Sequence, residues 1–232
     1  MVTVSGPPSS GKTSVILKTI DAIKKSGLKV GVVKFDCLYT DDDELYRKAG
    51  IPVRKGLSGS LCPDHYFVSN IEEVVEWGIA EKLDMLITES AGLCNRCSPY
   101  IKDVVAVCVI DNLSGINTPK KIGPMLKTAD VVVITKGDIV SQAEREVFAS
   151  KVNSVNPKAA IIHVNGLTGQ GAFEFSTLLK VDSSDIETVK GKELRFPMPS
   201  ALCSYCLGET KIGSDYQMGN VRKIDLGDDD DK

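Results

Sequence analysis

The sequence predicts an α/β fold: a mostly parallel sheet flanked by helices on both faces. Apolar, strand-like runs alternate with helical patterns along the chain, which is typical of a parallel sheet. Most of these runs are continuously apolar, as expected for strands that are covered on both faces. They lie at residues 2–4, 29–33, 85–88, 104–110, 131–134 and 160–164.

Helical patterns separate several of these strands, at residues 12–26, 44–49, 71–82, 119–127, 142–153 and 172–179. The character of the chain changes after Pro197, where residues 198–226 contain two cysteines and little periodicity. We therefore expect a main domain at residues 1–197. We expect residues 198–226 to form a short cysteine-containing C-terminal appendage, which packs on the main domain or on a dimer partner because it is too small to fold alone.

Composition limits the classes of function. A chain of 232 residues with 42% hydrophobic and 25% charged residues can bury one core plus a small appendage. The net charge of −3 is accounted for by the Asp-Asp-Asp-Asp-Lys ending at Lys232, and the neutral remainder argues against nucleic-acid binding. That ending is either a native acidic tail or, because a tag-removing protease recognises it, a tag remnant at residues 227–232.

No run is long enough to span a bilayer, and the N-terminus leads straight into a strand. We expect a cytoplasmic protein that does not associate with membranes. Disulfides are then disfavoured, and the seven cysteines point instead to metal binding or redox work.

The segment from Gly6 to Thr13 fits the pattern G-x-x-x-x-G-K-[ST], which binds nucleotide phosphates. Its glycines let successive N–H groups point at the phosphates, Lys12 can bridge the β- and γ-phosphates, and the Thr13 hydroxyl can bind Mg²⁺. A strand precedes the loop and a helix follows, as an anion site requires; an ordinary turn before a helix is the structural alternative. The expected phosphate-binding residues are Gly6, Ser9, Ser10, Gly11, Lys12, Thr13 and Ser14.

Two carboxylates follow predicted strands. Glu89 ends the run at 85–88 and can hold Mg²⁺ or its water, while Gly92 just beyond it lets a backbone N–H approach the γ-phosphate. Asp36 closes the second strand and either positions Mg²⁺ or the attacking water, or caps the following turn. We expect Lys12, Asp36 and Glu89 to be catalytic, and Thr13, Asp36 and Glu89 to bind Mg²⁺.

The run at 131–134 leads into a base-reading candidate. The Asp138 carboxylate can accept two hydrogen bonds from the N1–H and N2–H₂ edge of guanine, and the stem of Lys136 would lie along the ring. Asn165, Gly166 and Leu167 follow the next strand and could offer backbone N–H groups to the guanine oxygen. GTP is therefore expected, with ATP as the alternative.

The ordered set of motifs resembles the SIMIBI-class P-loop GTPases that act as metallochaperones: the urease and hydrogenase nickel-insertion GTPases and their cobalamin-related cousins. The resemblance covers residues 1 to about 180, and the urease accessory type is the most similar. It implies a homodimer that forms around GTP and Mg²⁺, with metal ligands near the interface and a client metalloenzyme or its maturation factors as partner. The matching residues are Gly6 to Thr13, Asp36 to Thr40, Glu89 to Gly92, Thr135 to Asp138, and Asn165 to Gly169.

The chain departs from the family pattern at three points. Thr135 replaces the usual asparagine, which bears on guanine selectivity. Asp64 is inserted in the family's Cys-Pro-His metal motif, so that the chain reads Cys62-Pro63-Asp64-His65. Two Cys-x-x-Cys pairs are not part of the urease pattern.

The first pair, Cys94 and Cys97, follows Gly92 on the segment expected to move with the γ-phosphate, and the second, Cys203 and Cys206, lies in the appendage. Together they offer four thiolates for an iron–sulfur cluster or for Zn²⁺ or Ni²⁺. Because 105 residues separate the pairs, a joint site needs tertiary contact or a dimer. Thiol redox chemistry and coincidence remain alternatives.

Cys62 and His65 form a softer metal candidate, which a symmetric dimer could complete; the alternative is a buried cysteine beside a turn histidine. Cys37 receives no role. Cys108, His163 and Trp77 are expected to pack in the core.

These features predict a GTP-hydrolysing metallochaperone in which nucleotide-dependent dimerisation forms or buries a metal site. Turnover by the chain alone should be slow, because the motifs contain no arginine finger or catalytic glutamine. The alternative is a nucleotide-driven iron–sulfur electron donor that activates a partner metalloenzyme. A small-molecule kinase is a third reading, for which no compact general base is found.

Overall fold

The structure is a computed structural model that describes residues 1–92, 94, 97–181, 187–196, 208–218 and 221–227. Seven strands form one sheet in the order β3-β2-β4-β1-β5-β6-β7, and each neighbouring pair is parallel. The predicted α/β class is thus confirmed, with a sheet that is parallel throughout. All carboxyl ends of the strands therefore lie at one edge of the sheet.

The strands are β1 (Val2–Ser5), β2 (Val30–Asp36), β3 (Val53–Leu57), β4 (Met85–Glu89), β5 (Val105–Asp111), β6 (Val131–Thr135) and β7 (Ala160–His163). The α-helices are α1 (Lys12–Lys24), α2 (Asp42–Lys48), α3 (Pro63–Ala80), α4 (Thr118–Lys121), α5 (Pro124–Lys127), α6 (Gln142–Val155) and α7 (Ala172–Val181). Two 3₁₀ turns, η1 (Asn112–Ser114) and η2 (Gly137–Ile139), follow β5 and β6.

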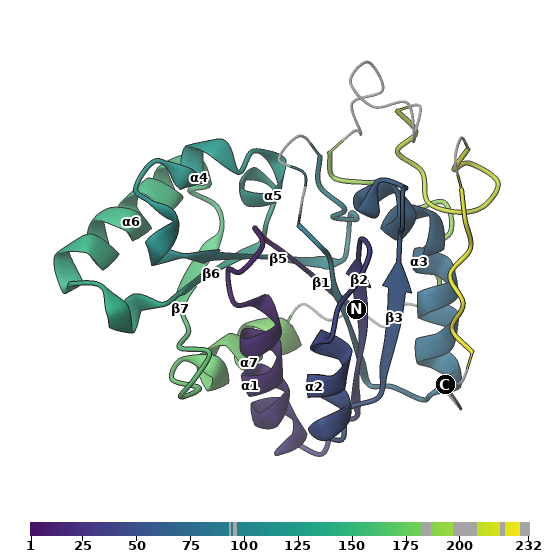
Figure 1. Cartoon of the computed structure of the whole chain (residues 1–232), viewed down its shortest axis with the longest axis horizontal. Coiled ribbons are helices and arrows are strands. Elements are labelled where there is room, and N and C mark those ends of the chain that lie inside the picture. Colours follow the sequence, from purple (N-terminus) through teal and green to yellow (C-terminus); the bar gives the residue numbers. More distant parts are fainter. Residues whose placement is uncertain (93, 95–96, 182–186, 197–207, 219–220, 228–232) are drawn as a thin grey trace.

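Helices cover both faces of the sheet (Figure 1). Helices α1, α2 and α7 pack on one face, where alternate residues of the strands, such as Val32 and Ile87, point toward them. The intervening residues, such as Val33 and Cys108, point to the other face and pack on α3 or on α5 and α6. Burial on both faces explains why the central strands are continuously apolar.

Three elements differ from the sequence prediction. Strand β3 was missed because Arg54 and Lys55 interrupt its apolar pattern; it is an edge strand that pairs only with β2 within the described sheet. Helix α3 begins eight residues before the predicted start, because Pro63 occupies its first turn and the apolar residues after it are buried. The helix predicted at 119–127 is two short helices, broken where Gly123 adopts a φ of +69° before Pro124.

The expectations for packing are confirmed at two of three residues. Cys108 is fully buried, and Trp77 is buried beneath the Arg54 guanidinium, which lies 5.5 Å from its ring centroid. The prediction that His163 belongs to the core is wrong, because β7 is the last strand of the sheet and the histidine side chain is exposed.

Described residues after 186 pack against the same core as α3. Val189, Leu194, Ile212 and Ile224 join the apolar cluster that contains Phe35 and helix α3. The side chain of Asn70 on α3 bonds both to the carbonyl of Arg222 and to the N–H of Ile224. The C-terminal segment therefore runs beside α3 (Figure 1). The domain boundary at residue 197 lies in a part of the chain outside the described residues.

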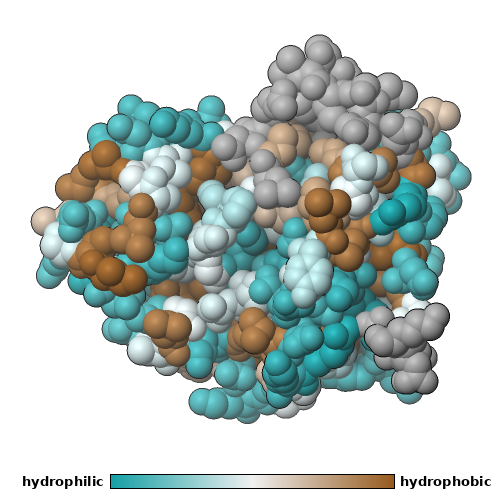
Figure 2. Space-filling model, in the orientation of Figure 1, coloured by the Kyte–Doolittle hydropathy of each residue, from teal (hydrophilic) through white to brown (hydrophobic). Residues whose placement is uncertain are grey.

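The surface is mixed in character. On the face shown in Figure 2, hydrophobic residues form separate patches among hydrophilic ones, as is usual for folded chains. Among the described residues, no helix is both long and apolar enough to cross a membrane.

The Arg195 guanidinium attaches the polypeptide after α7 to the main domain, so its loss should be costly. It forms a two-pronged ion pair with Asp130, at 2.6 and 2.7 Å, and donates to the carbonyls of Ile101, Thr128 and Val104. We expect Arg195→Met to lower the free energy of unfolding by about 2 kcal/mol or more, measured by urea denaturation.

Lys102→Met is the matched control, because Lys102 pairs with Glu193 on the exposed surface. Its cost should stay below about 1 kcal/mol. Equal losses in the two variants would contradict the anchoring role of Arg195.

Candidate functional site

The loop from Gly6 to Thr13 connects β1 to α1 at the carboxyl edge of the sheet. Lys12 is buried, and its Nζ donates to the loop carbonyls of Gly6 and Pro7 at 3.0 and 3.1 Å. Burial lowers the pKa of Lys12, and nearby Glu89 opposes that effect. Gly11 has a φ of +90° directly before the helix, a left-handed conformation that glycine adopts without strain.

Gly6 and Gly92 touch through their backbones. A Cβ on Gly92, whose φ is +67°, would lie 1.8 Å from the Gly6 carbonyl oxygen. A Cβ on Gly6 would in turn lie 2.0 Å from the carbonyl oxygen of Val109 on β5. The phosphate loop and the segment after Glu89 are therefore in direct contact, and neither position has room for a side chain.

A cluster of carboxylates lies beside Thr13. The Thr13 Oγ1 is 2.9 Å from Glu89 Oε1 and 3.0 Å from Asp42 Oδ2. The same two oxygens lie 2.7 and 2.8 Å from the Nζ of Lys34. This set of carboxylate and hydroxyl oxygens has the chemistry that Mg²⁺ prefers, so the residues present fit that ion.

Glu89 is fully buried, and its environment compensates its charge. Tyr46 donates to Glu89 Oε2 at 2.7 Å, and burial together with Glu89 raises the pKa of Tyr46 well above its ordinary value. Burial alone would lower the pKa of Lys34, but Glu89 and Asp42 raise it above its ordinary value. Burial alone would raise the pKa of Asp42, but the Lys34 ammonium lowers it below its ordinary value.

Asp36 lies at the margin of this cluster. Its Oδ2 is 3.8 Å from Lys34 Nζ, and its Oδ1 accepts a hydrogen bond from the N–H of Cys37 at 2.8 Å. The carboxylate thus caps the following turn while it also faces the cavity.

Sequence reasoning missed Lys34, Asp42 and Tyr46. The acidic run at 41–44 was a usable signal for Asp42, because it follows the predicted Asp36 segment. Lys34 interrupts an otherwise apolar strand, which is also unusual for a buried position. Lys34 and Asp42, but not Tyr46, border a cavity of about 370 Å³ beside the phosphate loop. It is lined by Pro8, Ser9, Gly11, Lys12, Thr13, Ser14, Lys34, Asp36, Asp42, Leu45, Glu89 and Ala91.

The predicted base-reading loops meet the phosphate loop. Thr135 Oγ1 donates to the carbonyl of Ser10 at 2.6 Å, and Lys136 Nζ donates to the carbonyl of Ser9 at 2.8 Å. A Cβ on Gly166 would lie 2.9 Å from the Cβ of Ser14. The loops after β6 and β7 therefore both contact the phosphate loop.

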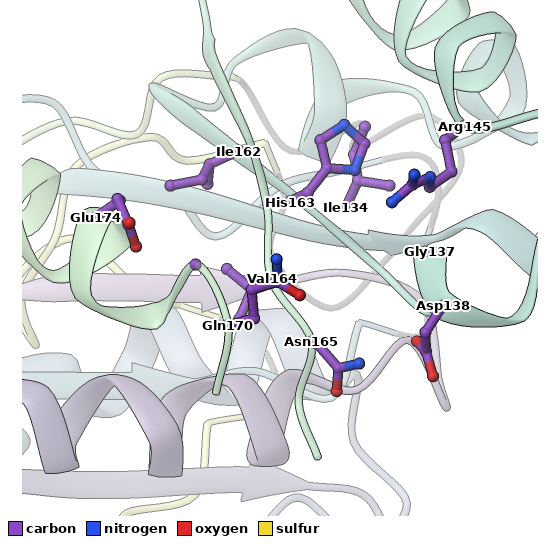
Figure 3. A pocket seen from close by; sticks show the side chains of 11 residues that line it. Ile134, Gly137, Asp138, Arg145, Ile162, His163, Val164, Asn165, Gln170 and Glu174 are labelled. Atoms are coloured by element: carbon purple, nitrogen blue, oxygen red, sulfur yellow. The ribbon is translucent and has the colours of Figure 1, made fainter. Parts of the chain in front are cut away.

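The loop after β7 has a defined turn. The Asn165 side-chain oxygen accepts hydrogen bonds from the N–H groups of Leu167 and Thr168, at 2.9 and 3.0 Å. Asp138 is exposed in η2, just after β6, and it lines a second cavity of about 310 Å³ together with Asn165. In Figure 3 the side chains of Asp138 and Asn165 lie on one side of this pocket, while His163 and Arg145 lie on the other.

Two of the predicted metal-binding cysteines meet a carboxylate. Ligand atoms of Asp64, Cys94 and Cys97 all lie within 4.8 Å of one another. The Cys97 thiol donates to Asp64 Oδ2 at 3.1 Å, and both residues are buried. Burial raises the pKa of Asp64 to about 6, against the effect of the Cys97 hydrogen bond. Burial and then Asp64 raise the pKa of the Cys97 thiol.

The other predicted metal ligands are not part of this group. Cys62 is the N-cap of α3, and His65 is buried in the first turn of the helix beside Gln217. Burial lowers the pKa of His65. Cys203 and Cys206 lie outside the described residues.

Comparisons with known proteins agree with this arrangement. The nucleotide-binding domain described as CobW/HypB/UreG matches residues 1–163. The chain belongs to this family. A protein of Methanocaldococcus jannaschii, named uncharacterized protein MJ0120, is 52% identical over 222 residues, which cover 96% of this chain and 94% of the relative. The urease accessory protein UreG of Yersinia enterocolitica is 31% identical over 196 residues, covering 77% of this chain and 87% of UreG.

Solved structures show the same fold. The hydrogenase maturation factor HypB of Archaeoglobus fulgidus has a TM-score of 0.61 at 24% identity, covering 78% of this chain and 88% of HypB. HypB of Helicobacter pylori, solved in complex with nickel, has a TM-score of 0.63 at 21% identity, covering 80% of this chain and 89% of HypB. The expected resemblance to the urease and hydrogenase nickel-insertion proteins is thereby confirmed, and the chain is a member of a P-loop nucleotide-binding family.

The contact between Gly92 and Gly6 leads to a prediction. Gly50 has nearly the same positive φ as Gly92, +62° against +67°, but a Cβ there meets no atom within 4 Å. Gly50→Ala should therefore lower the free energy of unfolding only by the conformational cost, about 1–2 kcal/mol. Gly92→Ala should cost about 2 kcal/mol more, because the methyl group must displace the phosphate loop.

Urea denaturation of the two variants measures the difference, and titration with a fluorescent GTP analogue measures nucleotide affinity. Gly92→Ala should weaken nucleotide binding, while Gly50→Ala should not. Equal stability and equal affinity would show that the two glycines are not packed as described.

Proposed function

We propose that the chain is a GTP-hydrolysing metallochaperone, which binds a metal ion or metal cluster at Cys94 and Cys97 and delivers it during maturation of a metalloenzyme. Membership of the family and the juxtaposition of a phosphate loop with a thiol cluster support this proposal. The metal is the cargo, and the nucleotide sets when it is held and when it is released.

The observation that carries the proposal is the short segment from Glu89 to Cys97. It begins at a carboxylate beside Thr13, touches the phosphate loop through Gly92, and ends at the two cysteines. A nucleotide that moves Gly6 or Glu89 must therefore act on the segment that carries both thiols. This is a local contact that can convert nucleotide state into a change of metal affinity.

Nucleotide binding would use the cavity beside the phosphate loop. Lys12 would bridge the β- and γ-phosphates, and the N–H groups between Gly6 and Ser14 would contact the phosphate oxygens. Mg²⁺ would be held by Thr13 with Asp36, Glu89 and Asp42, and when bound it would neutralise charge on the phosphates.

Asp36 is suited to orient the attacking water, since its carboxylate faces the cavity from the end of β2. Among the described residues that line this cavity, Lys12 and Lys34 are the cationic side chains, and there is no arginine or glutamine. Slow hydrolysis is therefore expected until a client protein contributes a further group.

Preference for guanine would come from Asp138. Its exposed carboxylate can accept from both the N1–H and N2–H₂ groups of guanine, and adenine has no such pair of donors. Thr135 and Lys136 are hydrogen-bonded to the phosphate loop, which supports a base site at Asp138, directly beside the phosphate site.

A homodimer is proposed to close around the nucleotide. Leu38 and Tyr39 are exposed large hydrophobic residues on the connection between β2 and α2, and Leu45 borders the cavity. Exposed apolar side chains at the rim of a site favour burial against a partner. A second copy placed there would cover the cavity and shield the nucleotide from water.

The alternative of a nucleotide-driven iron–sulfur electron donor receives no support from a described feature. A four-thiolate site with Cys203 and Cys206 stays a prediction, because those residues lie outside the described part of the chain.

Coupling between nucleotide and metal tests the proposal. We expect the affinity for Zn²⁺, measured by competition with a chromophoric chelator, to differ at least about 5-fold between the Mg²⁺ complexes of GTPγS and GDP. Light scattering should report a dimer with GTPγS. By linkage, Zn²⁺ must change the affinity for GTPγS by the same factor.

Lys12→Ala is the matched control, since it should remove the nucleotide dependence and leave Zn²⁺ binding by the free protein unchanged. Identical Zn²⁺ affinity and identical mass in all nucleotide states of the wild type would rule the proposal out.

Base recognition gives a separate prediction. In Asp138→Asn the amide offers a donor where the carboxylate was an acceptor, which matches the additional C2 carbonyl of xanthine. We expect GTP affinity to fall at least about 10-fold and XTP affinity to rise, because a mismatched buried hydrogen bond costs about 1–3 kcal/mol. Competition against a fluorescent nucleotide measures both; an unchanged GTP affinity would place base recognition elsewhere.

A further inference from the structure

We infer that Asp64, Cys94 and Cys97 together bind a single divalent, thiophilic metal ion such as Zn²⁺, with the Asp64 carboxylate as a direct ligand. This inference deepens the proposed function. The role of the ion as cargo rests on that function. It moves the metal centre away from Cys62 and His65, the pair that the family motif designates.

The spacing of the ligand atoms fits one ion. Two sulfurs bound to the same Zn²⁺ lie at most about 4.6 Å apart, because each Zn–S bond is about 2.3 Å long. The three ligand atoms lie within 4.8 Å of one another, so small side-chain rotations bring all three onto one centre.

Asp64 has an unused ligand atom at this position. Its Oδ2 accepts from the Cys97 thiol, whereas its buried Oδ1 has no hydrogen-bond partner among the described residues. A buried carboxylate is normally paired with a cation or fully hydrogen-bonded. No ion pair to Asp64 is found among the described residues, and the Cys97 thiol is a neutral donor, so a metal ion would supply the missing positive charge.

The helix geometry explains why Asp64, and not its neighbours, faces the cysteines. Cys62 is the N-cap of α3, with extended backbone, whereas Asp64 and His65 lie in the first turn, where successive residues are rotated by about 100°. A single face of the helix therefore cannot present all three. The residue inserted in the family motif is the one that meets Cys94 and Cys97, and His65 packs instead beside Gln217.

The ligand set found among the described residues also favours one ion over a cluster. Iron–sulfur clusters are held mainly by four cysteine thiolates, whereas Zn²⁺ accepts thiolate and carboxylate together. Structural zinc sites are closed by four protein ligands; three protein ligands leave one position open. An open position suits an ion that must pass to a client.

The test uses the full chain, purified anaerobically and without nucleotide. Wild type should bind one equivalent of Zn²⁺. Asp64→Asn, which keeps the shape but loses the charge, should weaken Zn²⁺ by more than about 100-fold, because removing groups that merely support a ligand already costs about 10–100-fold. Cys94→Ser and Cys97→Ser should act similarly. Cys62→Ser is the matched control and should stay within about 3-fold of wild type.

Co²⁺ provides a readout of ligand identity. In Asp64→Cys the number of thiolates rises from two to three, so the intensity of thiolate-to-cobalt charge transfer should rise by about half. This variant also decides the matter if Asp64→Asn fails to fold, as judged by circular dichroism.

The inference is overturned if Asp64→Asn binds Zn²⁺ like wild type, if the Asp64→Cys spectrum equals that of wild type, or if Cys62→Ser abolishes binding. Wild type that carries iron with inorganic sulfide, or that binds no Zn²⁺, overturns it too. These outcomes are separate from the proposed function: a nucleotide-dependent metal affinity with Asp64 uninvolved leaves the metallochaperone intact, and a site that ignores nucleotide leaves the ligand set intact.

Discussion

The ion pair between Lys34 and Glu89 organises the carboxyl edge of the sheet. Glu89 is completely buried, and an unpaired charge in that position would be strongly destabilising. The Lys34 ammonium also reaches Asp42 at the start of α2, and the same oxygens contact Thr13 at the start of α1. One cation therefore fixes the ends of two strands and the beginnings of two helices relative to each other.

The two sides of the cavity beside the phosphate loop are held by different kinds of contact. The carboxylates of Glu89 and Asp42 are held by Lys34, and Glu89 is held further by Tyr46. Beyond Glu89, Ser90 donates a hydrogen bond to the Ser5 hydroxyl, and Gly92 lies directly against the backbone of Gly6 in the phosphate loop. A displacement of Gly6 would therefore bear directly on the segment that leads from Gly92 to Cys94.

Much of the architecture could be predicted from sequence because each signal was local. The phosphate loop is contiguous, and the apolar central strands are easily recognised. Strand β3 was hidden because edge strands tolerate residues such as Arg54, and His163 was misjudged because nothing local reveals that β7 ends the sheet.

The site was harder to predict where it depends on tertiary contact. Lys34 and Asp42 matter through their positions in space, and the proximity of Asp64 to Cys97 joins residues 33 positions apart. Spacing within a motif suggested Cys62 and His65 as ligands, whereas the side chain in contact with Cys97 is that of Asp64. Patterns along a chain identify residue types well, whereas packing decides which of two adjacent side chains faces a given partner.

The C-terminal segment has a consequence for how the chain behaves in solution. Strand β3 is an edge of the sheet, and residues near the end of the chain lie over it: Arg54 donates to the carbonyl of Leu226, and Ile224 packs on Gly56. Unprotected sheet edges recruit strands from other molecules. Shortening the polypeptide before Arg222 would remove this cover and favour self-association through β3, so residues 222–226 help to keep the edge strand from pairing with other molecules.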